Sequence, residues 1–332
     1  MHDVMHLFII NPLSFRSTKD MDDIVLKLQT YFYNMKNSRF VLHKSRYPRD
    51  AINVIRRCRT SVPSGQLLRV YAVGGDGILF DCVNGAAGLT NTEITVMPFG
   101  MRNDFMMNFG VENIQVFRDI NNFKSVKTFP ADLIFSETLH MIGYCNIGMD
   151  AVFTKYMRIV DSALNKSAAM SKLIPTVNYF YKEFASLNNP NANRLYDITI
   201  DGEEITGHFA GINILNGMYT GTEKCVAPGA LLDDGLLDVI IVKSQTTFGA
   251  TSLMRRFYAG EHKHFPKQFI YRQAKSVKIT SEEPFLVCQA GDVFSQKSIS
   301  ASVVPGAVTF AVPANAVLPQ TVPFAEGVSE NA

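Results

Sequence analysis

The chain lacks the basic excess that marks most nucleic-acid-binding proteins. Its 332 residues carry 32 lysines and arginines against 30 aspartates and glutamates, a net charge of +2. This near-balance argues against a nucleic-acid partner. The chain also lacks paired cysteines, since its five are widely spaced and form no CxxC motif. That spacing excludes a disulfide framework and a cysteine zinc site, and it is typical of reduced thiols in a cytoplasmic protein.

Long apolar runs and leader segments are missing too. No run reaches the ~20 apolar residues that a membrane-spanning helix needs. The N-terminus, MHDVMHLFII, has neither a basic leader region nor a cleavage site, so we expect no signal peptide. With 47% hydrophobic and 19% charged residues, the chain has the composition of a folded protein. We expect about two domains, a cytoplasmic location and only peripheral contact with a membrane.

The N-terminal third alternates strands with helices. Apolar residues repeat at helical spacing between 21 and 35, and a second helix is expected over 51–57. Four short apolar runs predict buried strands at 7–10, 40–42, 70–73 and 94–97. This alternation predicts βαβ units and a parallel sheet.

The pattern changes near Pro130. Two helices are expected at 151–161 and 168–187, and β-type segments then dominate. Asp201-Gly202 is a hairpin signal between two of these segments. Further strands are expected at 236–242, 269–272, 276–279 and 285–288. The second half is therefore predicted to be antiparallel, as a sandwich or a flattened barrel.

A glycine-rich loop follows the third expected strand, with the sequence Gly74, Gly75, Asp76 and Gly77. Glycines let the backbone approach a ligand closely, and amides at the start of a helix suit a phosphate. Asp76 would repel that anion unless it held Mg²⁺ against a nucleotide phosphate. The alternative is a structural turn in which Asp76 is a hydrogen-bonding turn residue.

A second polar turn follows the next strand and contains Gly100, Asn103 and Asp104. The carboxyl ends of neighbouring parallel strands meet at one edge of a sheet, where such sheets bind their ligands. We therefore expect the two loops to form one site, which makes the purely structural interpretation less favoured.

Taken in order, these motifs resemble the catalytic domain of diacylglycerol and sphingosine kinases. GGDG at 74–77 is followed by VNG at 83–85 and PFGMRNDF at 98–105. NIGMDA at 146–151 and APGALLDDGLLDV at 227–239 continue the series. The resemblance covers roughly residues 5–295, and it is of the kind seen in the soluble bacterial lipid kinases.

The resemblance implies an α/β plus β fold. A Rossmann-like α/β nucleotide-binding domain, similar to that of NAD kinases and diacylglycerol kinases, would occupy residues 1–130. A C-terminal antiparallel β-sandwich domain would occupy 131–301 and receive the lipid. The last segment, about 302–325, would return to the first domain. ATP and lipid would meet in the cleft between the two domains.

The resemblance also implies site residues. Asp292, Asp76 and Asp104 would be catalytic, with Asp292 as the base that the family supplies as a glutamate, one methylene longer. An ordinary turn at Gly291-Asp292 is the alternative. The residues expected to contact the nucleotide are Gly74, Gly75, Asp76, Gly77, Ser45, Gly100 and Asn103.

A second, structural Mg²⁺ is implied at Asp234, helped by the carbonyls of Leu231 and Leu236. Oxygen ligands suit such a hard cation. Without the resemblance, Asp233-Asp234-Gly235 is better interpreted as a turn. Asp132 matches an aspartate that the family keeps at the hinge into the second domain.

Several positions depart from the family pattern. Ile78, Phe80 and Met101 replace hydroxyl or amide side chains near the nucleotide, Asp81 replaces a glutamate, and Ala290 precedes the expected base. Each hydrogen bond lost to a charged phosphate costs ~1.5–3 kcal/mol. Either the site has re-formed around another nucleotide or acceptor, or the chain is a degenerate kinase that binds without turnover.

We expect an ATP- and Mg²⁺-dependent lipid kinase that phosphorylates diacylglycerol or a related lipid alcohol. Its partners would be a nucleotide and a lipid at a membrane surface, with a homodimer left open. An NAD kinase is less favoured, because the second half lacks the threonine–glycine–serine–threonine segment of that family. A non-catalytic lipid- or nucleotide-binding protein on the kinase scaffold is the other alternative.

Two segments bear on lipid access. Apolar helical stretches at 156–164 and 170–184 would wall an acyl-chain pocket or pack in the core. Basic residues interleaved with aromatics suit an anionic membrane, or form a solvated face whose aromatics are buried. These basic residues are Arg255, Arg256, His262, Lys263, His264, Lys267, Arg272 and Lys275.

Overall fold

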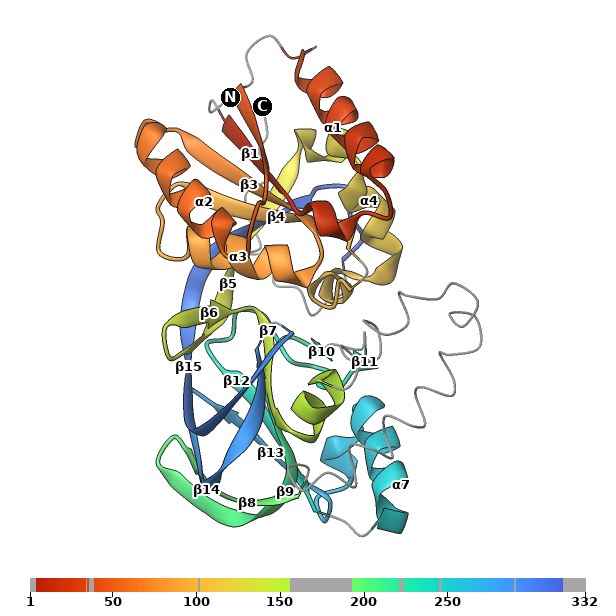
Figure 1. The fold of residues 1–332 in the computed structure, drawn as a ribbon, viewed down its shortest axis with the longest axis vertical. Coiled ribbons are helices and arrows are strands. Elements are labelled where there is room, and N and C mark those ends of the chain that lie inside the picture. Colours follow the sequence, from red (N-terminus) through yellow and green to blue (C-terminus); the bar gives the residue numbers. More distant parts are fainter. Residues whose placement is uncertain are drawn as a thin grey trace.

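The structure, a computed structural model, describes residues 4–33, 35, 39–100, 102–155, 193–220, 224–244, 247–289 and 291–318. Two halves are stacked along the long axis of the molecule (Figure 1). Helices flank a sheet in the first half, and strands dominate the second. Helices 151–161 and 168–187 were predicted; residues 151–155 are helical, and the remainder lies outside the described residues.

The first half contains a parallel sheet in the order β4-β3-β1-β2. Its strands are β1 (Val4–Ile10), β2 (Arg39–Lys44), β3 (Leu67–Gly74) and β4 (Thr92–Pro98). The inner strands β3 and β4 are buried along almost their whole length, whereas the edge strand β2 is partly exposed. Near-continuous apolar runs are what a sheet covered on both faces requires, and the predicted parallel sheet is confirmed.

Helices connect these strands. The longer ones are α1 (Thr18–Tyr33), α2 (Asp50–Ser61) and α3 (Asp76–Ala86). The short ones are η1 (Pro12–Ser14), η2 (Phe105–Phe109), η3 (Val111–Asn113), α4 (Ile114–Arg118) and η4 (Ile120–Lys124). A Cβ on Gly85 would lie 2.8 Å from the Ile55 side chain. Glycine at that position therefore allows α2 and α3 to pack closely.

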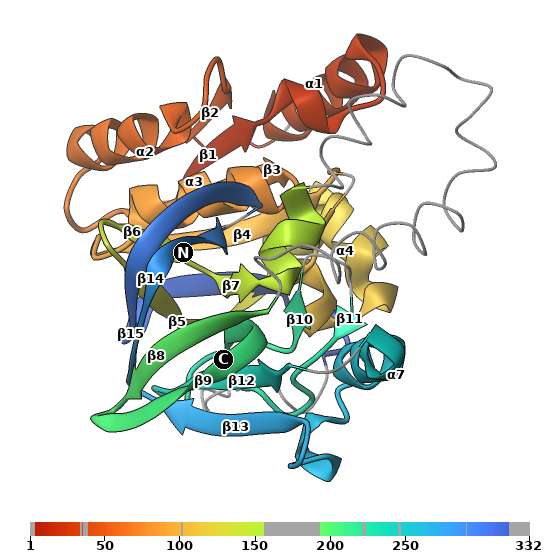
Figure 2. The ribbon, with the colours of Figure 1, turned by 60° about the horizontal axis from the view of Figure 1, so that its bottom comes forward.

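The second half is largely antiparallel, and Figure 2 shows it from below. Its leading strands are β5 (Val126–Ser136), β6 (Leu139–Met141), β7 (Gly143–Gly148), β8 (Arg194–Ile200), β9 (Glu203–Asn216), β10 (Tyr219–Thr220) and β11 (Lys224–Cys225). The chain continues through β12 (Leu237–Lys243), α7 (Thr247–Tyr258), η6 (His262–His264), β13 (Phe269–Ala274), β14 (Ser276–Gln289) and β15 (Asp292–Pro313). The hairpin predicted at Asp201-Gly202 is confirmed between β8 and β9.

The prediction of separate strands at 276–279 and 285–288 is wrong. They form one strand, β14, whose pairing with β15 shifts register between Thr280 and Phe285. The intervening polar residues form an irregularity within the strand, a β-bulge in effect.

β15 links the two halves. It pairs with β14 in the second half, then with β5, and finally runs parallel to β4 through Thr309 and Phe310. Phe310 and Val312 are buried in the hydrophobic core of the first half. The main strands thus form one hydrogen-bonded sheet, and β15 appears in Figure 1 as the blue strand that runs between the halves. Among the described residues, no helix is both long and apolar enough to cross a membrane.

Candidate active site

The two polar loops meet at the carboxyl edge of the parallel sheet, as predicted. A Cβ on Gly100 would lie 2.4 Å from the Cα of Gly75, and a Cβ on Gly75 would lie 2.5 Å from the carbonyl oxygen of Arg102. The Phe99 amide also donates to the Gly74 carbonyl, at 3.1 Å. Backbone contact this close excludes any side chain at Gly75 and Gly100.

Gly77 is different. It is exposed on the first turn of α3, and a Cβ there would meet no heavy atom of the described residues within 4 Å. Packing within the described protein therefore does not require glycine at this position. Because Gly77 has no side chain, there is open space beside the N-terminus of this 11-residue helix. Amide groups and the helix dipole favour an anion there.

Asp76 joins the loops through its carboxylate. One oxygen accepts the Asp104 amide at 2.8 Å, and the other accepts the Phe105 amide at 3.2 Å. Asp76 is therefore a hydrogen-bonding residue of the turn, as the alternative interpretation states, but its carboxylate also neighbours a second carboxyl group. The Asp76 and Asp104 side chains also line the same cleft, and burial raises the pKa of Asp76. Two neighbouring carboxylates repel each other when both are charged, and a shared proton or a bound cation would relieve that repulsion.

A narrow cleft opens at this carboxyl pair and is shared by both halves. Its lining residues are Asp76, Leu79, Phe80, Asp104, Phe105, Ile142, Gly143, Tyr144 and Tyr219. The first five belong to the α/β half and the last four to the β-rich half. Burial raises the pKa of Tyr144 well above its usual value. The Tyr144 hydroxyl in the cleft wall is therefore neutral and can form hydrogen bonds. The cleft therefore places apolar and phenolic walls around two carboxyl groups.

The other residues predicted to contact a nucleotide stand near the same edge. The Asn103 side chain donates to the Gly100 carbonyl at 2.8 Å and so stabilises its own loop. Ser45 follows β2; its amide donates to the Ile10 carbonyl, and its hydroxyl donates to the Tyr47 carbonyl at 3.3 Å. Their predicted roles toward a nucleotide stay predictions.

Two of the apolar departures, Ile78 and Phe80, are buried side chains of α3. Ile78 and Phe80 are only 3% and 2% exposed. Ile78 packs in the core of the first half, whereas Phe80 reaches from α3 into the core of the second half. Phe80 therefore holds the two halves together. Met101 and Ala290 lie outside the described residues.

Arg49 is a site residue that the sequence did not reveal. Its amide and its guanidinium both donate to Asp81, at 2.9 and 2.8 Å, and its guanidinium carbon lies 4.1 Å from the centre of the Phe80 ring. A further guanidinium nitrogen lies 3.2 Å from a carboxylate oxygen of Asp292. These partners are 243 residues apart in the chain, and no local motif indicates the contact.

This contact locates the predicted base. Asp292 begins β15, its side chain is 58% exposed, and it lies beside α3 in the other half. Asp81 is five residues beyond Asp76 on that helix, which corresponds to about 7.5 Å of helix rise. The structure therefore brings Asp292 to the helix that carries Asp76.

The predicted metal loop is tied to the hinge residue Asp132. Both carboxylate oxygens of Asp132 accept backbone amides, from Gly306 at 2.7 Å and Gly235 at 2.6 Å. Asp234 accepts the amide of Leu236 at 3.0 Å, which is the predicted turn. Burial and the Asp132 charge raise the pKa values of Asp233 and Asp234.

A cation would relieve that repulsion, but the described residues include no group of three or more acidic, histidine or cysteine side chains arranged to hold one. The metal role of Asp234 with the carbonyls of Leu231 and Leu236 stays a prediction.

Asp150 gives a pH-dependent prediction. It is 5% exposed, accepts a hydrogen bond from the Tyr258 hydroxyl at 2.9 Å, and burial raises its pKa to about 6. A raised pKa favours the protonated carboxyl in the folded state, so this stability is full below pH ~4 and is lost as the pH rises through ~6. Asp150→Asn should remove up to about 3 kcal/mol of this pH dependence. The free energy of unfolding, measured in urea at pH 4.5 and pH 8 for the wild type and the variant, checks it. An equal change in that free energy between the two pH values in both proteins would contradict it.

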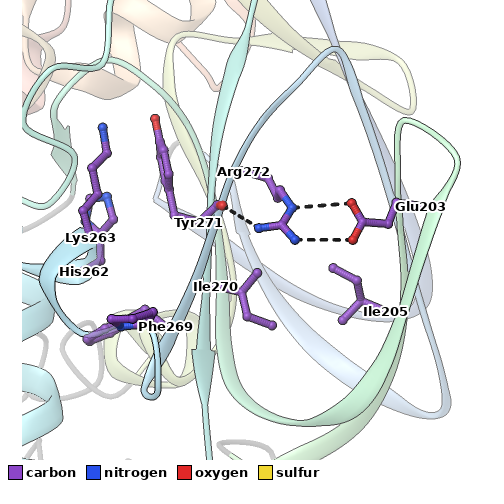
Figure 3. A pocket seen from close by; sticks show the side chains of 9 residues that line it. Glu203, Ile205, His262, Lys263, Phe269, Ile270, Tyr271 and Arg272 are labelled. Carbon is purple, nitrogen blue, oxygen red and sulfur yellow. Dashed lines mark hydrogen bonds and ion pairs between the residues drawn. The ribbon is translucent and has the colours of Figure 1, made fainter.

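The basic stretch of the second half forms a different surface. A groove of about 500 Å³ runs along the edge strand β13 and contains Lys263, Tyr271 and Arg272 (Figure 3). Lys263 lies 4.4 Å from the Tyr271 ring centre, and Arg272 pairs with Glu203. The aromatic residues Phe257 and Phe269 are buried in the core. The core interpretation is therefore correct for these two rings.

The comparisons agree with this architecture. Residues 5–135 match a family model described as the diacylglycerol kinase catalytic domain, and residues 156–312 match one described as the YegS C-terminal NAD kinase beta sandwich-like domain. A crystal structure of a diacylglycerol kinase from Bacillus anthracis superposes with a TM-score of 0.66, at 21% identity, covering 95% of this chain and 98% of that one. That likeness establishes the fold.

Two curated relatives are also similar. "Probable lipid kinase YegS-like" from Shewanella frigidimarina is 25% identical over 252 residues, covering 74% of this chain and 77% of its own length. The diacylglycerol kinase of Bacillus subtilis is 24% identical, covering 64% of this chain and 67% of its own length.

The fold and site thus define a two-part protein, with an α/β half and a β-rich half that share a cleft. The chain belongs to the diacylglycerol kinase family of lipid kinases, through a diacylglycerol kinase catalytic domain and a YegS-type C-terminal domain.

Proposed function

We propose that the protein is an ATP- and Mg²⁺-dependent kinase that transfers the γ-phosphate to a hydroxyl of diacylglycerol or a related lipid alcohol. The observation that carries the proposal is the Asp76–Asp104 pair at the cleft between the halves. In this proposal the α/β half is a Rossmann-like nucleotide-binding domain, residues 1–130 with the segment at about 302–325. The β-sandwich part, 131–301, receives the lipid.

The residues present fit the proposed nucleotide and metal. Open space at Gly77, beside the N-terminal amides of α3, suits a phosphate. The Asp76 and Asp104 carboxyl groups are oxygen donors of the kind that Mg²⁺ prefers. When bound, that ion would neutralise phosphate charge.

The chain's own residues would act on the acceptor. Asp292 would take the proton from the lipid hydroxyl, whose oxygen then attacks the γ-phosphorus. The bond to the bridging oxygen breaks, and ADP leaves. Most of the catalysis in such a reaction is positioning and electrostatic stabilisation. The two loops and the hairpin that carries Asp292 must therefore keep a fixed position relative to each other.

The test is transfer of labelled phosphate from ATP to a panel of lipid alcohols in mixed micelles. Asp76→Ala and Asp292→Ala are the matched inactive variants. Product on one lipid that disappears in both variants supports the proposal and identifies the acceptor. Folded protein that transfers phosphate to no lipid in the panel would overturn it for that panel.

One observation favours a second candidate, a non-catalytic lipid- or nucleotide-binding protein. Phe80 fills the space between the halves where the family has an amide, and Arg49 covers its ring. The second candidate predicts a thermal shift with Mg-ATP and no turnover. NAD kinase is less favoured still, and NAD included as an acceptor in the same assay tests it.

We also propose that the lipid is reached at an anionic membrane surface. Exposed basic side chains lie on α7, on η6 and along β13, and the only acidic residue between 252 and 275 is Glu261. Since Phe257 and Phe269 are buried, contact would be electrostatic, at about 1 kcal/mol for each basic residue near the surface.

This surface gives a salt-dependent prediction. Binding to vesicles with phosphatidylserine should fall steeply as salt rises from 0.05 to 0.5 M, and Lys263→Glu with Lys267→Glu should weaken it about tenfold or more. Co-sedimentation measures this. The matched control is Lys19→Glu with Lys27→Glu on the exposed face of α1. Equal losses in both double variants would contradict this surface.

A further inference from the structure

The contact between Arg49 and Asp292 joins the two halves at the cleft. On the β-rich side, Asp292 stands at the tip of the β14–β15 hairpin, paired with Gln289. Gln289 is buried, and its amide donates to the Ser136 hydroxyl at 3.1 Å. The stalk of the hairpin is therefore anchored in its own half, while its tip reaches toward the other half.

On the α/β side, Arg49 is held from several directions. It adopts a left-handed conformation, with φ 70°, just before α2. Its amide and one guanidinium nitrogen both bind Asp81, whose side chain is 8% exposed. The guanidinium also covers Phe80, which is itself buried. These contacts fix the guanidinium plane relative to α3, the helix that begins at Asp76.

A guanidinium fixed in this way can orient a carboxylate. Its fork of N–H donors is planar and rigid, so two carboxylates that share it are held at a set distance from each other. Here the two are Asp81 on α3 and Asp292 on the hairpin. The Asp292 side chain is 58% exposed at a hairpin tip, and holding such a side chain in one rotamer costs conformational entropy that a contact such as the one with Arg49 offsets.

We propose that Arg49 is the positioning residue of the hairpin carboxylate, and that it fixes Asp292 relative to α3 and hence to Asp76. The consequence for catalysis rests on the proposed kinase function, in which Asp292 is the base. Arg49 acts only through Asp292 in this scheme. A displacement of about 1 Å at a reacting group costs on the order of a hundredfold in rate.

The first experiment does not depend on turnover. Hydrogen exchange of the hairpin amides at 291–294 is compared in the wild type, Arg49→Ala and Arg49→Lys. We expect exchange about threefold faster or more in Arg49→Ala, and a smaller increase in Arg49→Lys, because lysine keeps the charge without the fork. Asp292→Ala should give the same faster exchange, and since its side chain is exposed it leaves α3 intact.

The matched control is Arg46→Ala. Arg46 lies in the same loop, is 66% exposed and pairs with Asp50 rather than with the hairpin. It should leave exchange at 291–294 unchanged. If Arg49→Ala also leaves it unchanged, or if Arg46→Ala accelerates it equally, the proposal is overturned, whether or not the protein has kinase activity.

The second experiment is a double-variant cycle on phosphate transfer, with Arg49→Ala, Asp292→Ala and both together. Arg49→Ala should lower kcat about 30- to 100-fold with little change in the KM for ATP. The double variant should be no slower than Asp292→Ala alone. Losses that multiply would show that Arg49 acts independently of Asp292, and would overturn the proposal. A wild type without turnover on any lipid would instead reject the kinase function and leave the exchange result to decide the role of Arg49.

Discussion

Asp76→Asn is expected to lower phosphate transfer about a thousandfold while the protein stays folded. The asparagine oxygen can still accept one of the two loop amides that Asp76 accepts from Asp104 and Phe105. The NH₂ group cannot accept the other amide, and it removes the negative charge from the carboxyl pair. The substitution therefore acts on the charge at the cleft more than on the loop, and initial rates with labelled ATP measure it.

Thermal unfolding separates the two effects. The loss of one amide acceptor should cost about 1–3 kcal/mol of stability, too little to unfold most proteins of this size. The control is Asp119→Asn, because Asp119 also accepts a backbone amide, from Asn121 at 3.0 Å, but caps η4 outside the two loops. Asp76→Asn with more than a tenth of wild-type activity would contradict the role assigned to the pair.

The fold was predictable where the signal is local. The apolar runs of β1, β3 and β4 identify buried strands, and the Asp201-Gly202 turn identifies a hairpin. The prediction failed at β14, because the polar residues between Thr280 and Phe285 have the composition of a loop. β14 pairs with β8 and β15 up to Thr280 and with β15 again from Phe285, so the polar residues between them interrupt the ladder without ending the strand.

The site divides in the same way. Gly75, Asp76 and Gly100 belong to two short loops that each follow a strand, so topology alone brings them together. Arg49 could not be predicted, since its contact with Asp292 depends on how the two halves are joined. From the sequence, Phe80 indicates only that the amide side chain of the family is missing. In the structure its ring packs into the core of the second half.

Glu93→Gln should destabilise the protein by about 3–5 kcal/mol. Glu93 on β4 pairs with Arg69 on β3, and the two side chains are 5% and 9% exposed. The guanidinium also donates to the Phe123 carbonyl at 3.3 Å, and together with burial its charge lowers the pKa of the nearby His6 to about 3. Neutralising Glu93 leaves the Arg69 charge buried without a counter-ion, which is the costly way to break a buried pair.

The second half provides a matched surface pair. Glu203 and Arg272 make the same kind of contact, but their side chains are 57% and 45% exposed. Glu203→Gln should cost no more than about 1 kcal/mol, and 1 M salt should reduce that cost further. The cost of Glu93→Gln should persist in salt, because water and ions do not reach the buried pair. Urea unfolding of both variants at 0.1 and 1 M salt decides the matter, and similar losses for the two would mean that Arg69 finds another counter-charge within the first half.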